Sequence, residues 1–275
     1  RDGRKERTRA RIDVMPKRSA AFFDLDKTVI AKSSTLAFTR PLYQAGLLKR
    51  RALLRAAVAQ AYYQLFGAGH EQLERARREL GELTKGWEKA EIERLAEETI
   101  EEIAAPLVYG EALELIDEHR SEGRRVVVVS SSPIEIVRPL CVYLGIEDVI
   151  ATEPAIDEHG RYTGEIAVYA YGEGKVELIQ RLAKAEKISL PDSYAYSDSA
   201  TDLPMLLAVG HPVAVNPDRK LRDEAEERGW PILEFVHPVP LPERVNPAAV
   251  ASGAAIVAGL AAVTAWAIRR SRRSN

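Results

Sequence analysis

Apolar and polar positions divide residues 19–236 into blocks with two different periods. Short apolar runs alternate with amphipathic segments whose apolar positions recur every three to four residues, which predicts strands separated by helices. A hairpin is expected over 152–157 and 161–169. This alternation predicts an α/β fold, a parallel sheet with helices on both faces. The expected strands are 20–25, 124–129, 148–151, 193–197, 212–215 and 231–235, and the expected helices are 109–122, 134–144, 174–187, 201–208 and 217–228.

The block between the first two strands has no strand pattern. Residues 31–108 instead predict an all-helical insertion that would cover the sheet as a cap. Its helices are expected at 41–66, from Pro41 to the break before Gly67, and at 70–85 and 88–104. The first of these helices carries Arg and Lys beside Leu, Tyr and Phe. It is therefore either a packed cap helix with a solvated basic face or a surface that approaches anionic lipid headgroups.

The two ends of the chain have a different composition. Residues 1–18 are basic and lack apolar periodicity, which predicts a disordered arm. A proline-rich linker at 237–247 leads to the uncharged segment 248–268 and then to a basic tail at 269–275. A helix of that length could span a hydrocarbon layer of roughly 30 Å. We therefore expect a C-terminal hydrophobic helix that crosses the membrane. Because the segment is rich in Ala, a soluble helix is the alternative.

Charge and cysteine content exclude several classes of protein. Lys and Arg number 39 and Asp and Glu number 41, so the overall charge does not favour nucleic acid as a partner. The single cysteine, Cys141, excludes an internal disulfide, and its apolar neighbours predict a core thiol. The five His residues lack acidic partners at metal-ligand spacing, which argues against a zinc enzyme.

The same features give an expected location. No apolar stretch typical of a secretory signal lies near the N-terminus. We expect the protein on the cytoplasmic side of the cell membrane, anchored by its tail. If the tail is not inserted, the expected location is the cytoplasm.

Two carboxylates stand directly behind the first apolar run, in Asp24-Leu25-Asp26-Lys27-Thr28. Like charges that lie close together repel, and each loses hydration when it is partly buried. A cation that neutralises them and a reaction that uses them would explain the arrangement. The simpler interpretation is a strand that ends in an acidic turn.

Further polar groups follow predicted strands or begin a helix. Ser130 follows a run of Val, Lys175 begins a helix, and Asp198 follows a strand with Asp202 four positions later. The carboxyl ends of parallel strands meet at one edge of a sheet, so we expect these groups near Asp24. Carboxylates, a hydroxyl and a lysine suit phosphoryl transfer with Mg²⁺, which prefers oxygen ligands. Taken singly, Lys175 would be a helix-start charge, and Ser130 and Asp202 would be helix caps.

The order and spacing of these motifs resemble the haloacid dehalogenase-like (HAD) hydrolase superfamily, specifically its phosphoserine-phosphatase-like branch (subfamily IB) with a helical cap of type C1. The resemblance covers about residues 19–236. It implies a Rossmann-like core formed by 19–30 and 109–236, with the cap at 31–108.

The resemblance also implies a role for each site residue. Asp24 would attack phosphorus and form an aspartyl-phosphate. Asp26 would protonate the leaving oxygen and then activate the hydrolytic water. The implied phosphate-binding residues are Ser130, Ser131 and Lys175. The implied Mg²⁺ ligands are the side chains of Asp24 and Asp198 and the main-chain carbonyl of Asp26. Asp202 and Thr28 would orient these groups without binding phosphate or metal themselves.

Two positions depart from phosphoserine phosphatases. Those enzymes carry a Glu nine positions after the nucleophile, where this chain has Ser33, and they read Ser-Gly-Gly where this chain reads Ser130-Ser131-Ser132. We therefore expect a Mg²⁺-dependent phosphomonoester hydrolase whose substrate is a small-molecule phosphate or a lysophospholipid-type phosphate. The alternatives are phosphoserine phosphatase proper, a phosphotransferase, and a phospho-acceptor signalling module that retains its phosphoryl group. The second Asp and the cap argue against the signalling module.

Overall fold

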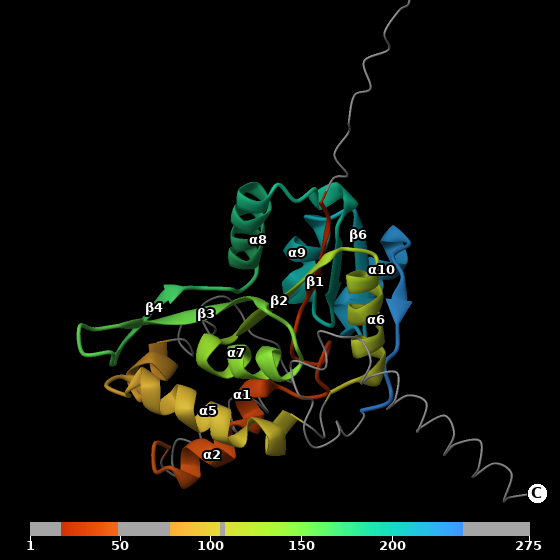
Figure 1. Cartoon of the computed structure of the whole chain (residues 1–275). Helices are drawn as coiled ribbons and strands as arrows, with labels where there is room; N and C mark the ends of the chain where they lie inside the picture. The colour runs from red at the N-terminus through yellow and green to blue at the C-terminus, as the bar shows by residue number, and fades with distance from the viewer. Residues whose placement is uncertain (1–17, 49–77, 105–107, 239–275) are drawn as a thin grey trace, which may run out of the picture.

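The structure is a computed structural model that describes residues 18–48, 78–104 and 108–238, with side chains omitted at 101–104 (Figure 1). Most of the predicted basic arm, the predicted membrane helix at 248–268 and the basic tail lie outside the described residues. No helix within the described ranges combines the length and apolar character that a bilayer span requires. The helix at 248–268 therefore stays a prediction.

The core is one sheet of seven strands in the order β4-β3-β2-β1-β5-β6-β7. All neighbouring strands are parallel except β3 and β4, which form the predicted antiparallel hairpin. The α/β prediction with a mostly parallel sheet is thus confirmed. The strands are β1 (Ala20–Phe23), β2 (Arg125–Pro133), β3 (Asp148–Ile156), β4 (Tyr162–Val168), β5 (Tyr194–Ser197), β6 (His211–Val215) and β7 (Ile232–Leu233).

Helices cover both faces of the sheet because side chains alternate along the buried strands. Ala21 and Phe23 of β1 pack in one cluster with α6 and α7, which also buries Cys141 as predicted. Ala20 and Phe22 point the other way, into a second cluster with α8, α9 and α10. The helices are α6 (Gly110–Ser121), α7 (Ile134–Tyr143), α8 (Glu173–Glu186), α9 (Leu203–Leu207) and α10 (Arg219–Arg228).

The described part of the cap region is helical, with α1 (Ser34–Ala37), α2 (Thr39–Gln44), a helical segment at 78–84 and α5 (Lys89–Ala104). The predicted helix from 41 to 66 is interrupted near its start, because α2 ends at Gln44, and its part from 49 to 66 lies outside the described residues. Gly46 adopts a φ of 78°, and its N–H donates to the Tyr43 carbonyl at 3.0 Å. A left-handed glycine of this kind closes a helix, and the prediction overlooked it.

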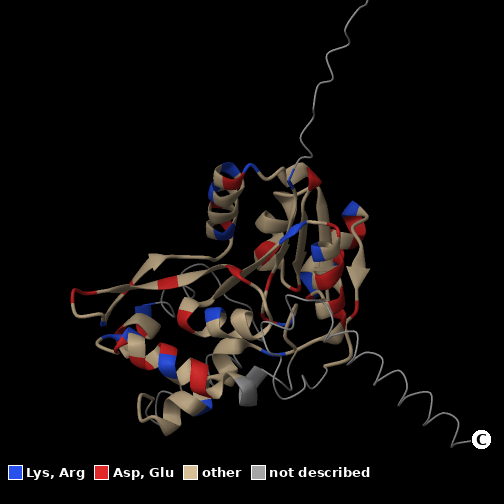
Figure 2. Ribbon diagram, in the orientation of Figure 1, with Lys and Arg blue, Asp and Glu red and all other residues tan. Residues whose placement is uncertain are grey.

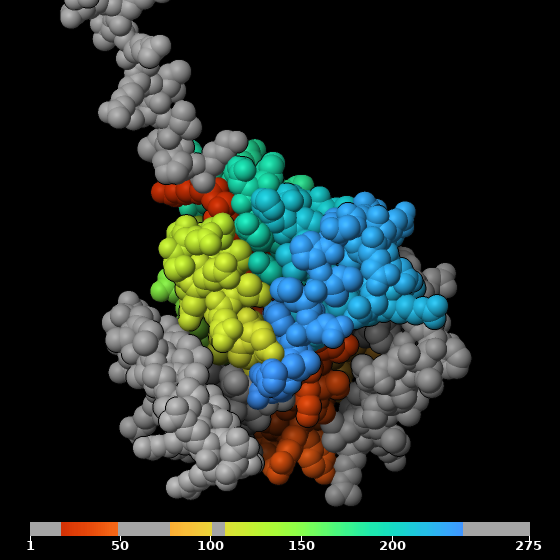
Figure 3. Space-filling model, turned by 90° about the vertical axis from the view of Figure 1, so that its right-hand side faces the viewer, coloured from red at the N-terminus to blue at the C-terminus, as the bar shows by residue number. Residues whose placement is uncertain are grey.

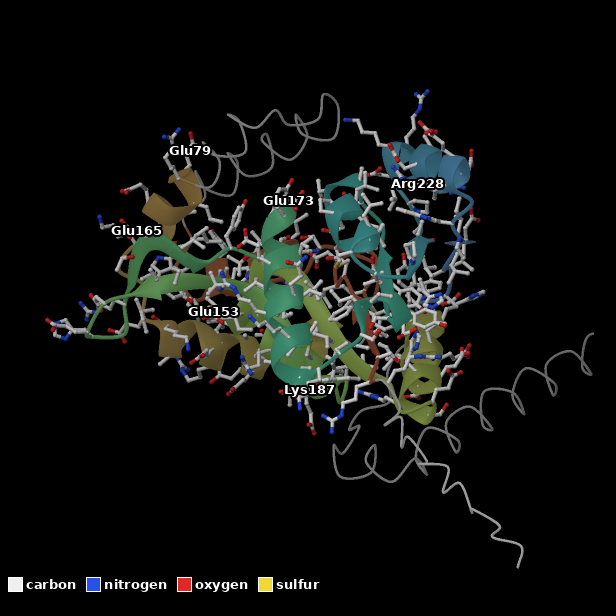
Figure 4. The ribbon with its side chains drawn as sticks, turned by 90° about the horizontal axis from the view of Figure 1, so that it is seen from above. Glu79, Glu153, Glu165, Glu173, Lys187 and Arg228 are labelled. Atoms are coloured by element: carbon white, nitrogen blue, oxygen red, sulfur yellow. The ribbon has the colours of Figure 1, made fainter. Side chains whose placement is uncertain are left out.

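The β3–β4 hairpin, which forms one side of the sheet, also contacts the cap (Figure 1). The Gly86 N–H donates to the Tyr162 carbonyl at 2.8 Å, and the Tyr162 N–H donates to the Trp87 carbonyl at 2.9 Å. In Figure 4, Glu79 of the helical segment at 78–84 and Glu165 of β4 mark these two neighbouring elements. The hairpin of the core therefore contacts the cap directly. The boundaries between core and cap stay predictions.

The described chain ends against α6. The Gly110 N–H donates to the His237 carbonyl at 3.1 Å, and Glu111 Oε1 accepts from the N–H groups of Val236 at 3.1 Å and His237 at 3.2 Å. Figure 3 shows this last segment, in blue, beside α6 in yellow and above the start of the cap in orange. The predicted linker therefore begins as a packed segment. Elsewhere, acidic and basic residues are interspersed along α5 and α8 (Figure 2).

Candidate active site

Three adjacent parallel strands, β2, β1 and β5, bring the predicted motifs to one edge of the sheet. Asp24 follows β1, and its N–H donates to the Tyr196 carbonyl of β5 at 2.9 Å. Asp198 directly follows β5, and Ser130 lies in β2. All three residues are buried. The common polarity of the strands thus explains why groups far apart in sequence approach one another.

Lys175 links Asp24 to Asp202. Its Nζ lies 2.7 Å from Asp24 Oδ1 and 2.8 Å from Asp202 Oδ2, and its side chain is only 3% exposed. Asp202 Oδ2 also accepts a hydrogen bond from Ser197 Oγ at 2.7 Å. Asp202 stands at the N-cap of α9, but its side chain makes no capping hydrogen bond to that helix. Lys175 is therefore a buried ion-pair partner rather than a surface charge at a helix start.

The approach of Lys175 depends on the start of α8. Gly172 precedes the helix with a φ of 53°, a conformation that favours glycine. A Cβ on Gly174 would lie 2.2 Å from the Tyr169 carbonyl oxygen, so only glycine fits there without a shift. The two glycines let the chain turn tightly and direct Lys175 at the strand ends.

The carboxylates of the site exceed its buried positive charge. Burial raises the pKa of Asp24 well above its usual range, and the charges of Asp202, Asp198 and Asp26 add to this effect while Lys175 opposes it. Burial likewise raises the pKa of Asp198 to about 7. Burial lowers the pKa of Lys175, but Asp24 and Asp202 outweigh it and hold that pKa above its usual value. The site would accept further positive charge.

A divalent cation fits this excess of negative charge. Asp198 has a weak ion-pair partner, since Lys27 Nζ lies 3.8 Å away and its side chain is 63% exposed. Among the described residues, no cluster of three or more His, Cys, Asp or Glu side chains could hold a metal ion. The predicted ligand set differs from such a cluster, because it combines two carboxylates, from Asp24 and Asp198, with the main-chain carbonyl of Asp26. Thr28, which was predicted to orient the ligands, is fully buried.

Asp26 turns toward the cap. Its Oδ1 accepts the Ser34 N–H at 2.8 Å, and its Oδ2 accepts a hydrogen bond from Ser132 Oγ at 3.2 Å. Sequence reasoning missed Ser34, Ser132 and Ser197 as site residues. The only available signal was the third serine after the Val run, where phosphoserine phosphatases have glycine.

The serine motif belongs to β2, which continues to Pro133 with an irregularity in its pairing to β3. The predicted strand end at residue 129 is therefore too early. Ser130 is buried, and its Oγ accepts the Ser132 N–H at 3.1 Å. Ser131, also predicted to bind phosphate, is exposed. Pro133, not Ser130, occupies the N-cap of α7.

The comparison with known protein families decides the family. The family model described as haloacid dehalogenase-like hydrolase matches residues 21–207. The chain belongs to the haloacid dehalogenase-like hydrolases. The predicted resemblance is thus confirmed, and so is the prediction that the chain is an enzyme of this family.

Relatives of similar length support this assignment. The chain is 50% identical over 265 residues to the "Inhibition of morphological differentiation protein" of Streptomyces azureus. The match covers 94% of this chain and 95% of the relative. It is also 50% identical over 254 residues to a "probable phosphatase" of Mycobacterium tuberculosis, across 91% of this chain and 88% of the relative.

A solved structure has a similar fold. A protein of unknown function from Bordetella pertussis superposes with a TM-score of 0.69 at 29% identity, and the match covers 79% of this chain and 98% of that protein. The fold described above is thus shared with an experimentally determined structure.

Proposed function

We propose that the chain is a Mg²⁺-dependent phosphomonoester hydrolase that forms an aspartyl-phosphate on Asp24. One observation carries this proposal. Lys175 holds Oδ1 of a buried Asp24, whereas within the described residues Oδ2 accepts no hydrogen bond. Oδ2 is the oxygen left to attack phosphorus.

The reaction would proceed in two displacements. Asp24 Oδ2 bonds to phosphorus as the bond to the leaving oxygen breaks, and Asp26 donates a proton to that oxygen. Asp26 then takes a proton from water, whose oxygen attacks phosphorus and releases Asp24. When bound by Asp24, Asp198 and the main-chain carbonyl of Asp26, Mg²⁺ would offset the repulsion between carboxylate and phosphate. Ser130, Ser131 and Lys175 would bind the phosphoryl oxygens.

The proposed substrate is a small phosphate monoester. The name of the relative from Mycobacterium tuberculosis supports a phosphatase. Ser33, which stands where phosphoserine phosphatases use a Glu, disfavours phosphoserine, because a hydroxyl binds an ammonium group more weakly than a carboxylate does. A lysophospholipid-type phosphate would suit an enzyme held at a membrane, but the predicted membrane segment at 248–268 lies outside the described residues.

Membership of a hydrolase family disfavours a signalling module that retains its phosphoryl group. A phosphotransferase would use the same residues with another acceptor in place of water. Release of free phosphate distinguishes hydrolysis from transfer.

The proposal is tested by phosphate release from 4-nitrophenyl phosphate with the full-length chain. We expect turnover with Mg²⁺, its loss with EDTA, and a decrease of at least about 1,000-fold in Asp24→Asn, because the nucleophile is removed. Asp223→Asn, an exposed carboxylate change on α10, is the matched control and should keep full activity. Full activity in Asp24→Asn would refute the proposed nucleophile.

A further inference from the structure

A series of hydrogen-bonded hydroxyl groups joins the cap to Asp26. Ser34 Oγ donates to Ser132 Oγ at 2.9 Å, and Ser132 Oγ lies 3.2 Å from Asp26 Oδ2. Thr35 Oγ1 lies 3.0 Å from Ser132 Oγ, and either atom of that pair could donate. Ser34 and Ser132 are both buried. Hydrogen bonds of this kind are costly to leave unmade in the interior, so the groups hold one another in place.

These groups come from three parts of the fold: α1, the end of β2 and the turn after β1. Ser132 stands in the extended end of β2, beyond the irregularity in its pairing with β3. Ser34 begins α1, the first helix after the core strand β1. Its main-chain N–H donates to Asp26 Oδ1 at 2.8 Å while its hydroxyl donates to Ser132. Both oxygens of Asp26 are thus held, one by the cap directly and one through Ser132.

We propose that Ser132 is a positioning residue that fixes the orientation of Asp26 as it exchanges a proton with the leaving group and with water. Ser34 extends this hold to the first cap helix. The inference rests on the proposed function, in which Asp26 is the general acid and base.

The two hydrogen bonds make the oxygens of Asp26 unequal. A main-chain N–H can only donate, so Oδ1 stays an acceptor. The Ser132 hydroxyl donates to Oδ2 from β2, while the Ser34 N–H donates to Oδ1 from α1. The carboxylate is therefore fixed from both the core and the cap.

The hydroxyl of Ser132 distinguishes this chain from phosphoserine phosphatases. Phosphoserine phosphatases read Ser-Gly-Gly at this motif, so they have no hydroxyl at the position of Ser132. The hydroxyl therefore adds a contact to Asp26 that a glycine cannot supply.

The test uses two esters that differ in how much they need the general acid. An alkyl phosphate such as 2-phenylethyl phosphate has a poor leaving group that requires protonation, whereas 4-nitrophenyl phosphate has a good one that does not. In the full-length chain, we expect Ser132→Ala to lower kcat/KM by roughly 10- to 50-fold for the alkyl ester and by less than about 3-fold for the nitrophenyl ester. Ser132→Thr, which keeps a hydroxyl, should restore the alkyl rate to within about 3-fold of the original.

Controls separate this inference from the proposed function. Ser121→Ala, at the exposed end of α6, should leave both rates unchanged. Asp24→Asn should abolish both rates, which establishes that the reaction uses the proposed nucleophile. If Ser132→Ala does not fold, as judged by circular dichroism, Ser132→Gly replaces it with the same expected outcomes.

Two results would overturn the inference while the proposed function stands: an equal loss for both esters in the Ser132 variants, or no loss for either. A chain that releases phosphate from neither ester would overturn the proposed function and this inference together.

Discussion

At the scale of single residues, the site balances a buried lysine against an excess of carboxylates. Lys175 contacts Asp24 and Asp202 at ion-pair distance with almost no exposure to solvent. Removing one partner of a buried ion pair leaves an uncompensated charge, which costs more than the pair contributes as a whole. The same contact should therefore matter to both folding and turnover.

We predict that Lys175→Met lowers the free energy of unfolding by about 3 kcal/mol and abolishes phosphate release. Adding Asp202→Asn should restore part of the stability, because one of the two unpaired carboxylates is removed, but none of the activity. Urea unfolding and the phosphate assay measure the two effects separately. Equal stability of Lys175→Met and the unaltered chain would contradict the role of the lysine as a buried counter-charge.

His119, in α6, is a buried titratable residue outside the proposed active site. Its Nε2 lies 2.7 Å from the Tyr196 hydroxyl, and Arg124 donates to its Nδ1 at 3.0 Å. Burial lowers the pKa of His119 to about 4, and the charge of Arg124 contributes to the shift. The imidazole is thus held neutral in the folded protein.

This gives a prediction for the dependence of stability on pH. The unfolded chain binds a proton to His119 near pH 6.5, whereas the folded chain does so only near pH 4. Stability is therefore lost as the pH falls through this window, by about 2–3 kcal/mol at its lower end. Urea unfolding at pH 7 and pH 5 should show a smaller decrease for His119→Gln than for the unaltered chain. Identical decreases would exclude His119 as the source.

Sequence reasoning at this scale identified residues that follow a strand or begin a helix. Asp24, Lys175 and Asp198 stand out because their spacing relative to apolar runs is visible along the chain. Ser132 could not be found in this way, because its partner Asp26 is 106 positions away and the contact forms only when β1 pairs with β2. A hydroxyl pattern in the sequence does not reveal which serine faces which carboxylate.

At the scale of elements, apolar runs predicted where strands and helices lie, and local contacts decided where they end. The buried Val run located β2, but pairing with β3 carries the strand on to Pro133. The helix predicted from Pro41 is interrupted at Gly46, which adopts a left-handed backbone conformation. The prediction missed this glycine because helix-forming residues stand on both sides of it. The residues at which strands and helices end are therefore the hardest to predict.

The start of α8 provides a test at this scale. Gly174→Ala would place a Cβ 2.2 Å from the Tyr169 carbonyl oxygen, so the first turn of α8 must move and carry Lys175 with it. We predict a decrease in kcat/KM of roughly 10- to 100-fold for 4-nitrophenyl phosphate. Gly123→Ala is the matched control, since a Cβ there meets no atom within 4 Å. It should cost some stability through its φ of 75° and leave turnover unchanged.

At the scale of the whole molecule, the fold places the reacting groups at one edge of the sheet and the cap beside them. Ser34 contacts Asp26 from the cap side, and the hairpin joins the cap near Gly81, whose Cβ position would lie 2.1 Å from the Gly164 carbonyl oxygen. The alternation of strands and helices was sufficient to predict this core. The contacts between cap and hairpin depend on close approach of two glycines, which no periodicity predicts.

The predicted membrane tail is also a property of the whole chain. If 248–268 forms a membrane helix, the full-length protein should sediment with membranes, and a variant that lacks 247–275 should appear in the soluble fraction with unchanged turnover. Membrane fractionation followed by the phosphate assay measures both. The same distribution for the two proteins would rule out the tail as an anchor.

The central claim is that Asp24 takes up the phosphoryl group. The most direct measurement is acid quenching of the full-length chain during turnover of a phosphate-radiolabelled monoester, followed by peptide mapping. We predict an acid-stable label on the peptide that contains Asp24 and none in Asp24→Asn. Turnover without any labelled protein, or a label that persists in Asp24→Asn, would contradict the account.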